Sequence, residues 1–177
     1  TDPLGRVTSF LYDNLGRKTR TTLPDPDGSG SLTAPQTNYT YDAGGHPRTV
    51  PDALGDVTTY AYDNLYRSIS VTQADPDGSG SLTSPVTTFV YDAAGQLTST
   101  TDPLGRVTSF LYDNLGRKTR TTLPDPDGSG SLTAPQTNYT YDAVGHQLTV
   151  TDALGNVTTS AYDNLYRLTT LTQADPD

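Results

Sequence analysis

The sequence contains no cysteine, no methionine and no tryptophan, and all 20 of its acidic residues are aspartate. Cysteine and glutamate are absent, and the two histidines, His46 and His146, lie in separate repeats, so the usual ligands of a metal-dependent hydrolase are missing. The lack of cysteine fits a reducing compartment or an extracellular protein stabilised by other means, so it leaves the compartment open. Since no constellation of catalytic groups is assembled, we predict no catalytic residue and no enzymatic activity.

Positive charge and long apolar segments are also scarce. Eleven Lys and Arg residues against 20 acidic residues give a net charge of −9, and only 32% of the residues are hydrophobic. A protein that binds nucleic acid needs a basic face, which this composition does not supply. No apolar run approaches the roughly 20 residues of a membrane span, and no secretory signal is present. We therefore predict neither nucleic-acid binding nor insertion into a membrane.

Aspartate, threonine and tyrosine dominate the residues that are present. The chain has 32 threonines and 12 tyrosines, and both residue types favour β-strands. Aspartate favours turns over helices because its short carboxylate bonds to nearby backbone amides. The composition predicts an all-β protein.

Internal repetition organises the whole sequence. The first 43 residues return unchanged at 101–143, and the next 34 residues return with ten substitutions. The pair Tyr-Asp occurs seven times, at alternating spacings of 29 and 21 residues. The basic unit is thus 21 residues long, with an eight-residue insertion in alternate units, a 50-residue double unit and a 100-residue super-repeat. We predict that residues 1–177 form one continuous array belonging to a longer chain.

Each unit carries two four-residue segments of the form Asp-x-x-Gly, such as "DPLG" at 2–5 and "DNLG" at 13–16. Asp at the first position and Gly at the last are typical of a type I turn followed by a left-handed residue, which closes a β-hairpin with a bulge. The segments between turns alternate: "RVTSFLY" places small aliphatic residues on one face and Thr and aromatic residues on the other. The predicted fold is therefore an antiparallel hairpin meander that forms an elongated array, a solenoid, spiral sheet or fibre, stabilised between neighbouring hairpins rather than by a compact core.

Two turns depart from this pattern, because tyrosine replaces the final glycine at Tyr66 and Tyr166 in "DNLY". A tyrosine in the left-handed region is strained. Either these turns are of another type, or the tyrosine is held in the strained conformation by packing.

The stretches "YDNLGRKTRTT", "YDAAGQLTSTTDPLGRVTSFLYD" and "TDALGNVTTSAYD" closely resemble the tyrosine-aspartate repeats of the RHS, or YD-repeat, family. This family includes wall-associated proteins, teneurins and the cocoon-forming subunits of insecticidal toxin complexes. The resemblance implies a long antiparallel sheet that spirals, often into a hollow shell around a toxin domain. It also implies a secreted or surface-exposed structural role, with no catalysis by the repeats. The regular insertion departs from the family pattern and suits an extended solenoid or fibre better than a shell of varying curvature.

The inserted segment "DPDGSGS" matches the opening of a calcium loop, with oxygen ligands at Asp25, Asp27 and Ser29 and glycine at the sixth position. The glutamate that such a loop carries at position 12 is missing, and Gln36 stands there. Two interpretations remain: a calcium half-site completed by a neighbouring copy, or a polar turn without metal. The other two copies supply Asp75, Asp77, Ser79, Asp125, Asp127 and Ser129.

Three triplets match the acceptor sequence for N-glycosylation, at Asn38, Asn138 and Asn156. Such triplets also arise by chance in a threonine-rich sequence.

A cluster of charges follows the turn at Asp13, where Arg17, Lys18 and Arg20 lie close together in sequence. It is interpreted either as a solvated strand face with cross-strand ion pairs or as a contact surface for another copy or an anionic glycan. The second copy of the cluster consists of Asp113, Arg117, Lys118 and Arg120.

Taken together, these patterns predict a non-catalytic structural repeat region of a secreted or cell-surface protein, located outside the cell or at its surface. Its predicted partners are further copies of itself, through unpaired strand edges that favour filament assembly, and glycans. The alternatives are a fragment of a toxin-encapsulating shell and a calcium-dependent adhesion or glycan-binding module. Calcium is the only cofactor that the sequence suggests.

Overall fold

The computed structural model describes residues 1–28, 32–52, 55–78, 80–128 and 130–174. These residues form fifteen β-strands and no helix, which confirms the predicted all-β repeat array. The chain divides into two compact units, Thr1–Thr88 and Phe89–Asp177, and strand β8 contributes residues to both. In the described part of the chain, no helix is long and apolar enough to cross a membrane.

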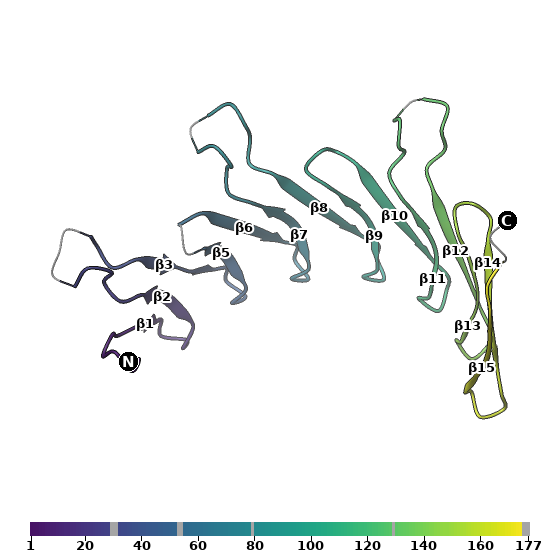
Figure 1. Cartoon of the computed structure of the whole chain (residues 1–177), viewed down its shortest axis with the longest axis horizontal. Coiled ribbons are helices and arrows are strands. Elements are labelled where there is room, and N and C mark those ends of the chain that lie inside the picture. Colours follow the sequence, from purple (N-terminus) through teal and green to yellow (C-terminus); the bar gives the residue numbers. More distant parts are fainter. Residues whose placement is uncertain (29–31, 53–54, 79, 129, 175–177) are drawn as a thin grey trace. The chain divides into compact units, whose positions relative to one another are not determined.

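The first unit begins with short hairpins and ends in strand β8 (Figure 1). Its strands are β1 (Ser9–Tyr12), β2 (Lys18–Thr22), β3 (Gln36–Asn38), β4 (Thr40–Tyr41), β5 (Pro47–Pro51), β6 (Val57–Tyr62), β7 (Ser68–Thr72) and the first part of β8 (Val86–Tyr91).

The second unit repeats this succession of hairpins. After the end of β8 its strands are β9 (Leu97–Thr101), β10 (Val107–Tyr112), β11 (Lys118–Thr122), β12 (Gln136–Tyr141), β13 (Gln147–Thr151), β14 (Val157–Tyr162) and β15 (Leu168–Thr172).

The strands follow one another in a meander. Hydrogen-bonded neighbours are consecutive in sequence, in a three-stranded sheet β1-β2-β3 and a twelve-stranded sheet running from β4 to β15. The pairings between these strands are antiparallel, for example β10 with β11 and β12 with β13. Within each sheet no crossover connection is needed, because each turn places the next strand beside the one before it.

Successive turns of a meander lie at alternate ends of the strands, so each unit has two edges of turns. We call the turns that begin at the aspartate of a Tyr-Asp pair YD turns, and the edge that they form the YD edge. The YD turns span residues 13–17, 42–46, 63–67, 92–96, 113–117, 142–146 and 163–167. The inserted segments leave from the opposite edge, and the two in the first unit extend from the same ends of their strands (Figure 1).

The predicted turn geometry is confirmed. In the turn at Asp13, the Gly16 amide donates to the Asp13 carbonyl at 3.0 Å, and Gly16 has a φ of 76°, in the left-handed region. The register of the two paired strands also shifts directly beside the YD turn. In the first hairpin Tyr12 pairs with Lys18, but Leu11 pairs with Arg20. Thr19 is therefore an extra residue on the returning strand, a β-bulge that bends the strand at the YD edge.

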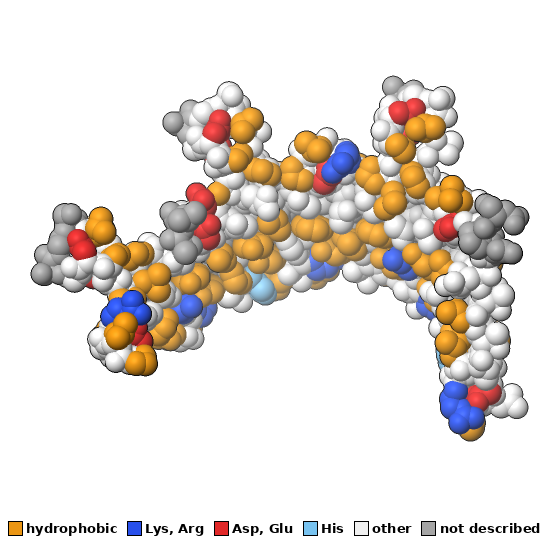
Figure 2. Space-filling model, viewed as in Figure 1, with side chains coloured by type: hydrophobic (Ala, Val, Ile, Leu, Met, Phe, Trp, Pro, Cys, Tyr) orange, Lys and Arg blue, Asp and Glu red, His pale blue; other side chains and the backbone are white. Residues whose placement is uncertain are grey.

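No described residue is buried, and apolar side chains remain partly accessible throughout. Figure 2 shows hydrophobic side chains spread among polar ones over the visible surface. A one-layer sheet covers each strand only on its two flanks, so stability must come from neighbour-to-neighbour contacts along the array. This agrees with the prediction that no compact core forms.

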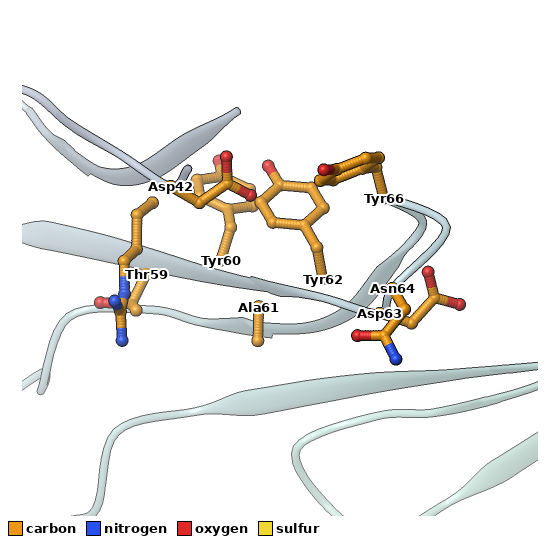
Figure 3. A pocket seen from close by; sticks show the side chains of 9 residues that line it. Asp42, Thr59, Tyr60, Ala61, Tyr62, Asp63, Asn64 and Tyr66 are labelled. Atoms are coloured by element: carbon orange, nitrogen blue, oxygen red, sulfur yellow. The ribbon is translucent and has the colours of Figure 1, made fainter. Parts of the chain in front are cut away.

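Side chains alternate between the two faces of the sheet as predicted. Around β6, Tyr60 and Tyr62 project to one side, and Thr59 and Ala61 project to the other (Figure 3). Thr59 lies on the face of Ala61, as the alternation of this strand predicts, and it pairs with both Thr49 and Thr72. Threonine occupies both faces because both are partly exposed, and its branched side chain suits any pleated surface.

Candidate functional site

The aspartate of each YD turn closes its own hairpin. In the turn at 113–117, Asp113 Oδ1 accepts hydrogen bonds from the backbone amides of Leu115 and Arg117 at 2.9 and 3.0 Å. Its Oδ2 accepts a bond from Arg117 Nε at 2.7 Å. The backbone amide of Arg117, followed by its guanidinium, holds the pKa of Asp113 below its ordinary value despite partial desolvation. The ionised carboxylate is therefore a structural part of the turn.

The tyrosine that precedes this aspartate contacts the previous YD hairpin. The Tyr141 hydroxyl donates to the Lys118 carbonyl at 2.8 Å, beside the bulge of the hairpin formed by β10 and β11. Burial raises the pKa of Tyr141, so its hydroxyl stays protonated as a donor. The same bond joins Tyr41 to Lys18, Tyr62 to Pro47, Tyr112 to Leu97 and Tyr162 to Gln147, at 2.7–3.0 Å.

This bond gives a physical reason for the Tyr-Asp pair. A bulge interrupts the regular ladder and leaves a backbone carbonyl to be satisfied, and the tyrosine of the next YD strand satisfies it. The aspartate then forms the turn from which the following bulged strand leaves. The tyrosine joins its hairpin to the preceding hairpin, and the aspartate closes the turn of its own hairpin.

The residue after the turn glycine strengthens the same junction. The Arg117 guanidinium lies 4.8 Å from the ring centroid of Tyr141, and its Nη1 donates to the Asp142 carbonyl at 2.7 Å. In the first unit, Arg17 lies 4.8 Å from the Tyr41 ring and reaches the Asp42 carbonyl at 3.4 Å. The arginine therefore binds its own aspartate and the next tyrosine at once.

Histidine takes this position in two turns. The His46 ring lies 5.2 Å from the Tyr62 ring and is stacked 4.6 Å from the Tyr66 ring, and its Nδ1 is 3.3 Å from Asp42 Oδ1. Figure 3 shows Asp42, Tyr62 and Tyr66 on the same side of β6. A depression in this part of the first unit is lined by Asp42, Thr59, Ala61, Asp63, Asn64, Tyr66, Arg48, Tyr60 and Tyr62.

The stack on histidine decides between the two interpretations of the "DNLY" turns. Tyr66 and Tyr166 have φ values of 61° and 64°, and their amides donate to Asp63 and Asp163 at 2.9 Å, as the glycine amides do in other turns. The turn type is unchanged and the tyrosine is strained. Each ring packs on the preceding histidine. In the first unit a Cβ at Gly44 would overlap the Tyr66 ring, whereas the second unit has Val144 at this position.

The tyrosine rings lie against the imidazole of His46, and His146 is packed in the same way by Tyr162 and Tyr166. A histidine beside a carboxylate is a familiar pair in general base catalysis. Here the pair joins hairpins, and the chemistry that the geometry supports is stacking and hydrogen bonding.

The predicted calcium ligands lie in the inserted loops. In each loop the amide of the second aspartate donates to the carboxylate of the first at 3.2 Å, as in Asp27 to Asp25. The carboxylates of Asp27, Asp77 and Asp127 accept the amides of Leu32, Leu82 and Leu132 at 3.1–3.2 Å. These amide bonds are the main cause that lowers the pKa of Asp77 and Asp127. Ser29, Ser79 and Ser129 lie outside the described residues.

Among the described residues, no group of three or more His, Cys, Asp or Glu side chains is arranged to hold a metal ion. In the first unit, strands β5 and β6 lie between the inserted loops, so consecutive loops are not adjacent in the sheet order. The calcium site stays a prediction.

The three predicted glycosylation residues are exposed. Asn38 ends β3, and Asn138 lies within β12 opposite both Arg120 and Thr151. The side-chain amide of Asn156, which would carry a glycan, donates to Asp152 at 2.9 Å. Modification at these residues stays a prediction.

The predicted charge cluster is not a single patch. Arg17 pairs with Asp13 within one turn, at 2.7 Å, rather than across strands. Lys18 lies over the rings of Phe10 and Tyr39, at 5.7 and 4.6 Å from their centroids. The bulge explains the separation, because an extra residue between Lys18 and Arg20 changes the face on which each projects. In the second copy, Arg117 pairs with Asp113, Lys118 lies over Phe110 and Tyr139, and Arg120 reaches Gln136 at 3.5 Å.

Sequence reasoning missed the hydrogen bond from tyrosine to the bulge carbonyl. The tyrosine and the carbonyl are 23 residues apart where an inserted loop lies between them and 15 residues apart elsewhere. These spacings become informative only when the bulge is known.

Comparison with known protein families decides the classification. The profile of the RHS repeat matches residues 1–29, 41–79, 91–129 and 141–176. The chain belongs to the RHS repeat family. Each match includes one or more YD turns, so the matched segments are the hairpins whose junctions are described above. A comparison with curated proteins finds no match.

Several solved structures share the fold. The crystal structure of TcdB2-TccC3-Cdc42 is similar with a TM-score of 0.72 and 20% identity, over 94% of this chain and 9% of that one. A Photorhabdus luminescens Tc holotoxin pore with a mutated TccC3 gives a TM-score of 0.70 and 19% identity, over 96% of this chain and 9% of that one. The RHS repeat chain described here spans about a tenth of the length of such structures.

Proposed function

We propose that this chain is a wall segment of a shell built from RHS repeats, with a structural role and no catalysis of its own. The observation that carries the proposal is a sheet one layer thick whose hairpins are joined at the YD edge by tyrosine bonds to bulge carbonyls. Such a sheet has two accessible faces and no core among its described residues. A wall needs this construction, because it must extend by adding hairpins while leaving one face for the interior.

Two further observations support the proposal. The similar Tc structures align with nearly all of this chain, and their chains are about ten times as long. The resemblance of the Tyr-Asp repeats to the RHS family also implies a hollow shell. A location outside the producing cell, or at its surface, follows as part of the same proposal.

Electron microscopy of the purified native protein tests this role. We expect hollow particles whose walls have the thickness of a single β-sheet, about 10 Å. Solid globular particles, in which both sheet faces are covered by other parts of the protein, would contradict it. Protease treatment of intact cells tests the location, because an external protein is digested while a cytoplasmic control is retained.

A regular filament is the second candidate, and the near-exact 100-residue repeat favours it. Identical segments at 1–43 and 101–143 form matching YD turns, and a regular filament requires equal steps. Strand edges that lack a partner favour further pairing. The same electron microscopy distinguishes the candidates, because a filament shows a regular axial repeat and no enclosed volume.

A calcium-dependent adhesion or glycan-binding role is the third candidate, and it depends on the inserted loops. Each loop begins with two aspartates, and the amide of the second donates to the carboxylate of the first, as from Asp77 to Asp75. Loss of binding to cell-surface glycans on chelation would support it, and binding that survives chelation would exclude the calcium dependence.

A further inference from the structure

Histidine occupies a position in two YD turns that arginine holds in most of the others. The guanidinium groups of Arg17 and Arg117, which are permanently charged, contact the ring of the next tyrosine and form an ion pair with the aspartate of their own turn. His46 and His146 make the same two kinds of contact. Histidine is the side chain whose charge changes between about pH 5 and 8, so these two junctions alone combine this geometry with a titratable group.

Each histidine is placed so that a positive charge on its ring would strengthen a contact with aspartate. The Nδ1 atom of His146 is 2.8 Å from Asp142 Oδ2, and that of His46 is 3.3 Å from Asp42 Oδ1. A charged imidazole would form an ion pair with this carboxylate, which also accepts the backbone amide of the same histidine at 2.8 Å.

Two tyrosine rings flank each imidazole. The rings of Tyr162 and Tyr166 lie 4.8 and 4.9 Å from that of His146, with interplanar angles of 33° and 25°. A cation on a ring face is attracted by the negative π-cloud of tyrosine. Tyr166 keeps this place with a φ of 64°, a conformation that tyrosine rarely adopts.

The remaining charged groups around the two histidines differ in one respect. Both sites have an arginine of the preceding turn bonded to the carbonyl of the paired aspartate, Arg17 at 3.4 Å and Arg117 at 2.7 Å. The YD turn that follows each histidine contains an Asp–Arg ion pair, Asp63 with Arg67 and Asp163 with Arg167. In the first unit Arg48 lines the same depression as Asp42, whereas the second unit has leucine at position 148.

We propose that His46 and His146 are acid-strengthened latches between successive hairpins. Proton uptake by the imidazole tightens its contacts with the aspartate of its own turn and with both tyrosines of the next hairpin. The latch at His146 responds to acid more strongly than the latch at His46. The His146 ring is closer to its carboxylate, and the second unit has Leu148 where the first unit has the positively charged Arg48. The sheet therefore stiffens at these two junctions as pH falls through the mildly acidic range.

This regulation does not depend on whether the array builds a shell or a filament, since it concerns contacts within each unit. Amide hydrogen exchange of the intact chain tests it, with protection corrected for intrinsic rates at about pH 7.5 and about pH 5.5. The hairpins at 57–72 and 157–172 differ in sequence and are distinguishable by mass. We expect protection of 157–172 to rise about threefold to tenfold on acidification, and that of 57–72 to rise less.

The chain supplies its own controls. Gln96 occupies the latch position before the hairpin at 107–122, so that hairpin, and its identical copy at 7–22, should show no change in protection. The double variant His46→Gln and His146→Gln copies this neutral residue and should abolish the pH response while leaving the far-ultraviolet circular dichroism spectrum unchanged. A wild-type response that is flat, reversed, or retained in the double variant overturns the proposal.

The wild-type chain also provides a test that needs no substitution. Histidine and tyrosine ring protons followed by nuclear magnetic resonance should shift together, with a common midpoint, if the rings share the titration. Histidine signals that move while the tyrosine signals stay still would overturn the latch.

Discussion

Residues 1–43 and 101–143 have the same sequence, yet they form different strands. The segment 36–41 is split into β3 and β4 with a break at Tyr39, whereas 136–141 is the continuous strand β12. Because the two segments are identical, the difference must come from what they pair with. The comparison shows that a partner strand can decide whether a given sequence is one strand or two.

Proline in the partner strand explains the break. The Tyr39 amide donates to Thr19 on β2, so Asn38 and Thr40 face β5 on the other side. In the second unit Asn138 pairs with Thr151 on β13, but in the first unit Pro51 stands there and has no amide hydrogen to donate. The pairing of Thr40 with Thr49 survives, and the sheet divides just before it.

A second difference concerns exposure of the identical strands. Phe10 in β1 is 49% exposed, while Phe110 in β10 is half-buried. Strand β10 pairs with both β9 and β11, whereas β1 pairs with β2 alone among the described strands. A flanking strand thus supplies much of the cover that a core supplies in a globular protein.

Exchanging the partner residues should exchange the structures. Thr151→Pro should break β12 at Tyr139 and destabilise the second unit by about 2 kcal/mol, since one ladder bond is lost and the Asn138 carbonyl is left unpaired. Amide exchange measured by nuclear magnetic resonance checks the break. The reverse variant, Pro51→Thr, should join β3 to β4 and protect residues 36–41. An unchanged pattern in both variants would show that proline is not the cause.

Removing the tyrosine hydroxyl should weaken both copies equally. Tyr141→Phe and Tyr41→Phe each leave a bulge carbonyl without its donor, at 2.8 and 2.7 Å, so each should cost about 1 kcal/mol. Urea unfolding followed by circular dichroism measures the loss. Tyr139→Phe is the matched control, because the Tyr139 hydroxyl makes no hydrogen bond to a described residue. Unequal losses at 41 and 141 would mean that the junction depends on its surroundings.

Acid should loosen the turns of both copies together. The pKa values of Asp13 and Asp113 are lowered from 3.8, chiefly by the backbone amides of Arg17 and Arg117. Because the folded pKa is lowered, the carboxylate contributes its full stability at pH values above the ordinary pKa of 3.8. This stability is lost as the pH falls below about 3.8 and through the lower pKa of the folded protein. Thermal melting at decreasing pH checks this. Asp113→Asn should be less stable at neutral pH and show a shallower acid dependence.

Calcium should have the smallest effect. If the predicted sites at the inserted loops bind it, millimolar calcium should raise the melting temperature by about 1–2 °C, because the loops lie outside the strand pairings. Asp127→Asn should cancel the part of this rise due to its loop, and a magnesium control should give none. A melting temperature that is identical with calcium and with chelator would identify the loops as turns without metal.

Local chemistry was sufficient to predict the turns and the strand direction. Asp at the first turn position, Gly at the fourth and alternating strand residues specify a bulged antiparallel hairpin wherever they occur, as at 13–16 and 113–116. These features depend on residues within a few positions of each other, so the sequence contains all that is needed.

The contacts between successive hairpins could not be predicted from local sequence. The Tyr141 hydroxyl binds a carbonyl 23 residues earlier, and the strained Tyr166 is explained by a histidine 20 residues before it. The division of the sheet at Tyr39 depends on Pro51 in the next strand. Each of these contacts joins groups that only strand register and the bulge bring within a few ångströms, because register decides which side chains of separate hairpins share a face.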